Sequence, residues 1–209
     1  VHKLLCSLPV SKSTGLDNID NTLLRISADY IAEPLCHIFN SSLRQGVFPT
    51  MWKQAKIIPL IKNKALPLNG PNSRPISLLP AISKLMEKIC KQQIQTYLVS
   101  NDILSDCQHA YKQYHSTSSA LVQMSDRWLE EIDKGNLVGA VLLDFSAAFD
   151  VVNHEILLAK LKCYGFEESA LGWLRSYLTN RTQTVFVNGS VSSHKECKSG
   201  VPQGSCLGP

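Results

Sequence analysis

The sequence has no long apolar run and no paired cysteines. No stretch approaches the ~18 consecutive apolar residues that a membrane-spanning helix needs, and no signal-peptide pattern is present. The seven cysteines are scattered, and none belongs to a Cys-x-x-Cys pair. Such an odd, unclustered set is typical of free or buried thiols in a reducing compartment, and it argues against a disulfide framework or a zinc site. We therefore expect an intracellular protein of the nucleus and cytoplasm.

Charge is also sparse, because 18% of the residues are charged against 44% that are hydrophobic. This balance excludes a disordered chain, and 209 residues are enough for one large domain or two subdomains with a buried core. The net charge of +4 suits a polyanionic partner without establishing one. The chain begins at Val1 and ends at Pro209 inside a turn-rich motif, so we expect both ends to be cut from a longer protein.

Apolar residues recur at helical spacing in several parts of the chain. Pro34 suggests a break or restart in the first of these segments, and Gly46 suggests its end. The second either begins near Pro80 or is capped by Ser83. The spacing predicts helices over residues 19–45, 80–98, 116–135, 156–165 and 171–178.

Strand signals occupy three other segments. The run at 55–62 is apolar and rich in β-branched residues, and the Asn, Gly and Pro residues of 63–73 predict a loop after it. Residues 137–145 form a short, continuously apolar run closed by an acid, which predicts a strand buried on both faces. Residues 182–197 predict a hairpin with a type I′ turn at Asn188-Gly189.

Asp144 ends the apolar run and is the first candidate for chemistry. A carboxylate leaving a rigid strand is what a metal ligand needs, because the backbone on either side holds it in place. Two-metal catalysis places the ions roughly 4 Å apart and needs several carboxylates to hold them. An acid at a strand end is more often a cap or turn residue, so the position alone leaves both interpretations open.

Several ordered blocks resemble the reverse transcriptases of non-LTR (LINE-like, jockey/CR1-type) retrotransposons. The run LDFSAAFD resembles motif A of that family and GVPQGS resembles motif B, with two helices and a hairpin expected between them. Upstream, SRPISLL resembles the motif that opens the fingers, and a further block precedes motif A. Even the N-terminal third resembles the run-in of these enzymes. The matching blocks lie at 12–17, 46–53, 73–79, 108–117, 143–150 and 200–205.

The resemblance implies an α+β fold, namely right-hand polymerase fingers with a partial antiparallel palm that stops before the catalytic hairpin. Residues 1–54 would be a helical run-in and 55–117 the fingers. Residues 118–152 would be the palm segment with motif A. Helices and a hairpin would fill 153–198, and 199–209 would start the motif B segment of the palm. The implied activity is RNA-directed DNA polymerisation, with an RNA template, a DNA primer and dNTPs as partners.

The resemblance also implies roles for single residues. Asp144 would be catalytic and bind two Mg²⁺ ions, with the Phe145 carbonyl helping on one. Phe149 would lie under the sugar of the incoming nucleotide and exclude a 2′-hydroxyl, although from the sequence alone it could simply be a core residue. Gln203 and Gly204 would contact the nucleotide, and the glycine would permit close approach of the backbone.

Two cations flank the loop at 63–73. The resemblance implies that Arg74 and Lys62 grip the triphosphate, with Lys64 equally plausible, whereas a solvated surface role is the ordinary alternative. We predict that Asp150 caps a helix beginning near Val151 rather than binding metal. His154 is predicted to be a packing or helix-surface residue rather than an acid or base.

The chain departs from the family pattern in the block before motif A and in the absence of motif C. Relatives have Gln-x-Gly-Phe-Arg where this chain has QHAYK at 108–112, so Ala110 is predicted to strain a glycine position, and Lys112 cannot fork onto a phosphate as Arg does. Tyr114 stands where a small residue is common. The sequence also contains no Asp-Asp pair, which the family's motif C would supply. We therefore expect the isolated chain to be inactive. A non-catalytic nucleic-acid-binding remnant, a maturase or telomerase-like relative, and an unrelated globular domain are the alternatives.

Overall fold

A computed structural model describes residues 1–10, 14–67 and 72–209, and the chain divides into two compact units. The first unit comprises Val1–Gln92 and Ala147–Gly208, and the second comprises Gln93–Ser146 with Pro209. Part of the run-in block at 12–17 and part of the predicted loop at 63–73 lie outside the described residues. Across those described ranges, no helix combines the length and the hydropathy that crossing a bilayer requires.

The first unit begins with helices α1 (His2–Cys6), α2 (Asn21–Ile26) and α3 (Ala28–Gln45). The predicted break at Pro34 is wrong, because Pro34 lies inside α3 and the interruption falls at Ser27. Pro34 deprives the Tyr30 carbonyl of its helical donor, but Tyr30 is 83% exposed and water can take the donor's place. The predicted end at Gly46 is confirmed, since Gly46 adopts the left-handed conformation with φ 67°.

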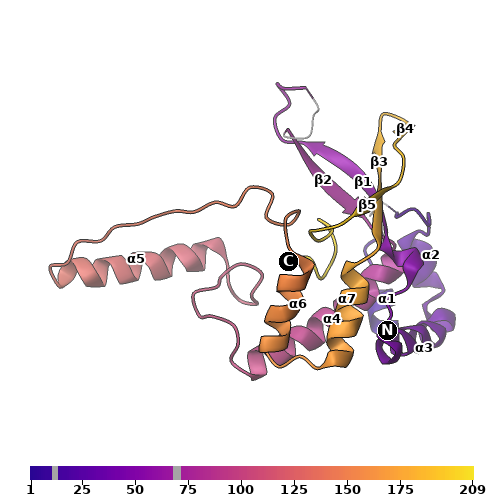
Figure 1. Ribbon diagram of the computed structural model, residues 1–209, viewed down its shortest axis with the longest axis horizontal. Helices are drawn as coiled ribbons and strands as arrows, with labels where there is room; N and C mark the ends of the chain where they lie inside the picture. The colour runs from indigo at the N-terminus through magenta and orange to yellow at the C-terminus, as the bar shows by residue number, and fades with distance from the viewer. Residues whose placement is uncertain (11–13, 68–71) are drawn as a thin grey trace. The chain divides into compact units, whose positions relative to one another are not determined.

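The strands of this unit form a mixed sheet, drawn above its helices in Figure 1. After the 3₁₀ turn η1 (Thr50–Lys53), strand β1 (Gln54–Ile61) pairs antiparallel with β2 (Ser73–Leu78). On its other side β1 pairs parallel with β3 (Arg181–Val187). The strand order is β2-β1-β3-β4, where β4 is Ser190–Val191, and β5 (Lys195–Cys197) also pairs with β3. The parallel pair brings two segments that are far apart in the chain side by side in the same direction.

The predicted hairpin at 182–197 is confirmed. Strand β3 turns at Asn188 and Gly189, which have φ values of 48° and 80°, the positive angles that a type I′ turn requires. The returning chain forms β4 (Ser190–Val191) and then β5 (Lys195–Cys197). Ala55 and Ile57 of β1 pack with Leu79 in a buried cluster under the sheet, which fixes the base of the β1–β2 hairpin.

Three long helices accompany the sheet: α4 (Ala81–Ser100), α6 (His154–Cys163) and α7 (Glu168–Leu178). Helix α4 begins directly after Pro80, so of the two predicted starts the one at Pro80 is correct. Helix α6 begins between the predicted starts near Val151 and at Ile156, and its cap is Asn153, whose Oδ1 accepts a hydrogen bond of 3.1 Å from the Ile156 N–H. The prediction that Asp150 caps this helix is therefore wrong.

An aromatic cluster packs helices α3 and α7 against the short segment that follows α3. The Phe48 ring makes edge contacts with Trp173 and Tyr177, at centroid distances of 5.5 and 5.1 Å. The indole Nε1 of Trp173 donates to Ser42 Oγ at 3.0 Å, and Ser42 Oγ donates onward to the Val47 carbonyl at 2.6 Å. The buried indole thus has its hydrogen-bond partner, as buried tryptophans require.

We expect Trp173→Phe to lower the free energy of unfolding by about 2 kcal/mol, because it removes a buried hydrogen bond and leaves a void. Urea titration followed by far-ultraviolet circular dichroism measures the loss. Trp128→Phe, on the exposed surface of helix α5 (Thr117–Asp133), is the matched control, and its change should stay within about 0.5 kcal/mol. Equal losses in the two variants would contradict the buried hydrogen-bond account.

The second unit contains helix α5 (Thr117–Asp133), which starts where predicted. Ser116 caps it, since Ser116 Oγ accepts from the Ser119 N–H at 3.1 Å and Ser119 Oγ accepts from the Ser116 N–H at 2.8 Å. The predicted strand at 137–145 is wrong, because this segment is an irregular, exposed stretch drawn without an arrow in Figure 1. A strand exists only with a neighbour that accepts its backbone hydrogen bonds, and none of the described strands pairs with these residues.

Candidate functional site

Backbone hydrogen bonds join the loop that follows β5, at residues 200–201, to the segment just before α6, at residues 149–152. The Val201 N–H donates to the Phe149 carbonyl at 2.7 Å, and the Gly200 N–H donates to the Val152 carbonyl at 2.8 Å. His154 is buried, and its Nε2 donates to the Gly200 carbonyl at 2.7 Å. The prediction of a packing role for His154 is confirmed. These bonds bring parts of the motif A and motif B blocks into contact inside the first unit.

The contact places Gln203 against Asp150. Nε2 of Gln203 lies 2.9 Å from Oδ1 and 3.0 Å from Oδ2 of the Asp150 carboxylate. A carboxylate only accepts hydrogen bonds, so the amide must present its NH₂ group to Asp150 and its carbonyl oxygen elsewhere. Asp150 therefore sets the orientation of the Gln203 amide, a role that sequence reasoning missed. Asp150 was taken for a helix cap, and no local pattern shows a partner 53 residues away.

Gly204 lies where two backbones approach closely. Its φ is 118°, and a Cβ added there would stand 2.8 Å from the Ser77 carbonyl oxygen. Next to it, the Ser77 N–H donates to the Gln203 carbonyl at 2.7 Å. Only a glycine fits this combination of backbone angle and space. The loop is thus held against β2 as well as against the segment before α6.

Gln203 and Asp150 line a cavity of about 290 Å³ in the first unit. Strands β1, β2 and β3 form one side of it and the loop at 197–203 forms the other. Pro75 and Ser77 of β2 also line it, next to the predicted triphosphate ligand Arg74. Arg181 lines it too, although its side chain is only 3% exposed. The cavity therefore offers an amide, a carboxylate and backbone groups along one wall.

The two candidate cations lie at the loop end of the β1–β2 hairpin, where β1 ends and β2 begins. Arg74 is opposite Leu60 in the register, and the Lys62 N–H donates to the Asn72 carbonyl at 2.9 Å. Lys62 and Arg74 are thus diagonal neighbours on one face, a spacing of about 7–8 Å between Cα atoms. Both residues are exposed. The hairpin brings the two side chains to neighbouring positions, and Lys64 follows in the turn.

The remaining predicted site residues divide between the units. Phe149 belongs to the first unit and is half-buried, whereas Asp144 and Phe145 belong to the second and are exposed in the irregular stretch. No three His, Cys, Asp or Glu side chains of residues 1–10, 14–67 and 72–209 gather as ligands of one metal ion. Asp144 alone cannot hold two divalent ions against their hydration, so the residues present do not by themselves fit a two-metal site.

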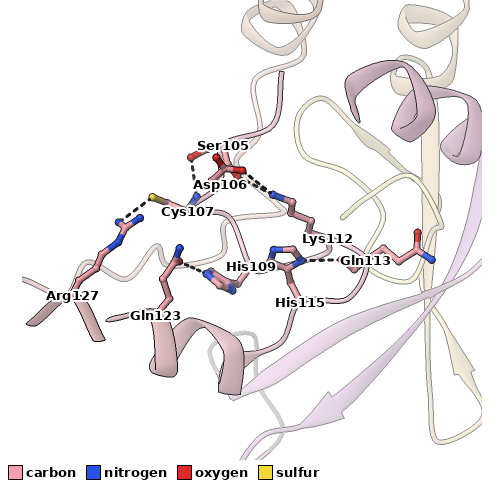
Figure 2. Close-up of polar contacts among 9 residues, drawn as sticks. All are labelled: Ser105, Asp106, Cys107, His109, Lys112, Gln113, His115, Gln123 and Arg127. Carbon is pink, nitrogen blue, oxygen red and sulfur yellow. Dashed lines mark hydrogen bonds and ion pairs between the residues drawn. The ribbon is translucent and has the colours of Figure 1, made fainter. Parts of the chain in front are cut away.

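The block at 108–117, which departs from the family pattern, forms a local polar cluster in the second unit (Figure 2). Nδ1 and Nε2 of His109 lie 2.9 Å from Ser119 Oγ and 2.7 Å from Gln123 Oε1 of α5. Lys112 Nζ donates to the Ser105 carbonyl at 3.3 Å. The predicted strain at Ala110 is wrong, because the positive φ values of this block, 58° and 62°, fall on Tyr111 and Tyr114. The residues of this block therefore contact α5 and the backbone at Ser105 within the second unit.

Comparisons with known proteins agree with the sequence blocks. Residues 61–209 match the family described as reverse transcriptase (RNA-dependent DNA polymerase). The chain is 37% identical over 97% of its length to the probable RNA-directed DNA polymerase from transposon BS of Drosophila melanogaster. It is 35% and 34% identical, over its whole length, to the RNA-directed DNA polymerases from mobile element jockey of Drosophila melanogaster and Drosophila funebris. It covers 22 to 23% of the length of these relatives.

Proposed function

Because the chain belongs to the reverse transcriptase (RNA-dependent DNA polymerase) family, we propose that it is one part of an enzyme that copies the RNA of a non-LTR retrotransposon into DNA. The observation that carries the proposal is the contact of the motif A and motif B blocks around one cavity. An RNA template, a DNA primer and dNTPs are the proposed partners. The chain covers only 22 to 23% of the length of these relatives, so in this proposal the longer protein, and not this chain alone, would perform the reaction.

We assign the β1–β2 hairpin to polymerase fingers, and the segments carrying Asp144 and Gln203 to a palm. In this proposal Arg74 and Lys62 hold the triphosphate from one face of the hairpin, with Lys64 as an alternative to Lys62. Their exposed, neighbouring positions support that role, since an accessible pair of cations can contact a polyphosphate. Phe149 would limit the space at the sugar, and Gln203 would contact the nucleotide at the cavity wall.

The family uses divalent metal ions. We propose that Asp144, helped by the Phe145 carbonyl, supplies one set of ligands for two Mg²⁺ ions in the longer protein. The other carboxylates would come from an Asp-Asp pair, which these 209 residues do not contain. Bound divalent ions would stabilise the negative charge of the transferred phosphoryl group. The chain by itself is therefore expected not to polymerise nucleotides.

Replacing Gln203 tests the nucleotide site most simply. In the longer protein, Gln203→Ala should raise the KM for dNTPs about tenfold, because one hydrogen bond to the nucleotide is worth about 1.4 kcal/mol. Steady-state primer extension at varied dNTP concentration measures the change. Gln183→Ala, a glutamine on the β3 wall of the same cavity, is the matched control and should leave KM within about twofold. An unchanged KM for the Gln203 variant would remove this residue from the site.

A second candidate is a non-catalytic nucleic-acid-binding remnant of a decayed element. The departures at 108–112 and the lone carboxylate Asp144 favour it. The genomic sequence beyond Pro209 discriminates between the two. An open frame that reaches Tyr-x-Asp-Asp supports the polymerase, whereas a stop codon before that motif supports the remnant.

A further inference from the structure

Glu87 is a buried carboxylate that none of the sequence blocks singles out. It lies in the second turn of α4, and its side chain is 0% exposed. Its Oε2 accepts from the Cys206 N–H at 2.7 Å and from the Leu207 N–H at 3.3 Å. The same oxygen accepts from the Tyr177 hydroxyl at 3.4 Å, and Oε1 accepts from Ser83 Oγ at 3.0 Å. A single side chain of α4 thus binds two consecutive backbone amides 119 and 120 residues further along the chain.

The surroundings of Glu87 supply hydrogen-bond donors and a nearby positive charge. Burial raises the pKa of the Glu87 carboxyl, while the Cys206 N–H and the charge of Arg181 oppose that rise. The Cys206 and Leu207 N–H groups can only donate, so Oε2 of Glu87 must act as an acceptor toward them. Arg181 is itself buried, and its guanidinium lies 4.9 Å from the centre of the Tyr177 ring. Its Nη2 has no hydrogen-bond partner in the described part of the chain, so Glu87 supplies the balancing negative charge nearby.

The two bound amides close the loop that carries Gln203. The turn itself is tight, since the Ser205 N–H donates to the Pro202 carbonyl at 3.1 Å and the Gly208 N–H donates to Ser205 Oγ at 2.9 Å. Its upstream end is fastened through Gly200 and Val201, and its middle through the Gln203 carbonyl. Glu87 provides the hold on the downstream end. Without these two hydrogen bonds the downstream end of the loop could move, and the Gln203 amide would be less firmly positioned.

We propose that Glu87 is a positioning residue whose buried carboxylate anchors the Cys206 and Leu207 backbone and so keeps the Gln203 amide in place at the cavity. The nucleotide part of this inference rests on the proposed function of Gln203. The anchoring part does not, because it concerns hydrogen bonds within the first unit. Glu87 acts through the loop and does not touch the nucleotide.

Hydrogen exchange of the 209-residue chain tests the anchor. Glu87→Gln keeps the shape of the side chain but removes the charge and one acceptor, so the Cys206 and Leu207 amides should exchange about tenfold faster or more. Ser83→Ala is the matched control, since it removes the donor to Oε1 and leaves the amide contacts of Oε2 intact. Its loop amides should exchange as in the wild-type chain, and the amides of α3 serve as an internal reference in both variants.

Unchanged exchange at Cys206 and Leu207 in Glu87→Gln would overturn the proposal. Equal acceleration in α3 would also overturn it, because it would show a general structural role. In the longer polymerase, Glu87→Gln should raise the KM for dNTPs more than it lowers kcat, and adding it to Gln203→Ala should cause little further change. If Gln203→Ala leaves KM unchanged while the exchange effect persists, the proposed nucleotide contact fails and the anchor stands.

Discussion

Asp144→Ala should abolish primer extension by the longer protein without changing its stability. Loss of a ligand to catalytic metal ions removes several kcal/mol of transition-state stabilisation, and about 4 kcal/mol corresponds to a rate loss of about 1,000-fold. Stability should not change, because Asp144 is exposed and makes no hydrogen bond or ion pair with any residue that the structure describes. Single-turnover extension measures the rate, and thermal unfolding measures the stability.

The control for this experiment is Asp126→Ala. Asp126 is an exposed carboxylate in the same unit, on α5, and its replacement changes the net charge by the same amount. It should keep extension within about twofold of the wild-type rate, as surface substitutions usually do. If the Asp144 variant retains activity comparable with that of the Asp126 variant, Asp144 is not a metal ligand, and the motif A assignment loses its main residue.

In the longer protein, Phe149→Val should admit ribonucleotides into the growing strand. A ring under the sugar excludes a 2′-hydroxyl by volume, and overpacking of this kind costs about 1–3 kcal/mol, or about 5- to 150-fold in selectivity. The ratio of kcat/KM for dNTP and rNTP in primer extension measures the effect. Phe149 is half-buried and its carbonyl binds the Val201 N–H, so the backbone of the variant should keep its place beside the loop.

The matching control is Phe166→Val, a half-buried phenylalanine of the same unit that lies between α6 and α7, outside the motif A and motif B blocks. It should leave sugar selectivity within about twofold of the wild-type value, even if it lowers stability. Unchanged selectivity in the Phe149 variant would dismiss its role at the sugar. The alternative interpretation, that Phe149 is a core residue, would then account for the position.

Local features of the fold were predictable from the sequence. The start of α4 after Pro80, the end of α3 at Gly46 and the turn at Asn188-Gly189 depend on the conformational limits of proline, glycine and asparagine. Each of these signals acts within a few residues. The pattern of apolar spacing predicted α5 for the same reason, because helical hydrogen bonds join neighbouring turns.

Features that depend on distant partners were not predictable. The apolar run at 137–145 has strand composition, but a strand needs a paired neighbour, and the sequence of the run does not specify one. Asp150 was assigned to a helix cap because a cap is local, whereas its partner Gln203 lies 53 residues further on. The anchor at Glu87 was missed in the same way. An apolar helical face with one acid gives no sign that the acid is buried against backbone amides.

The most direct test of the polymerase assignment is incorporation of labelled dTTP on a poly(rA) template with an oligo(dT) primer and Mg²⁺. Two proteins should be compared, the 209-residue chain and a version extended through an open frame beyond Pro209. The account predicts incorporation by the extended protein and none by the chain alone, because Asp144 has no carboxylate partners in the part that the structure describes. Incorporation by the chain alone, or none by an extended protein that contains Tyr-x-Asp-Asp, would contradict it.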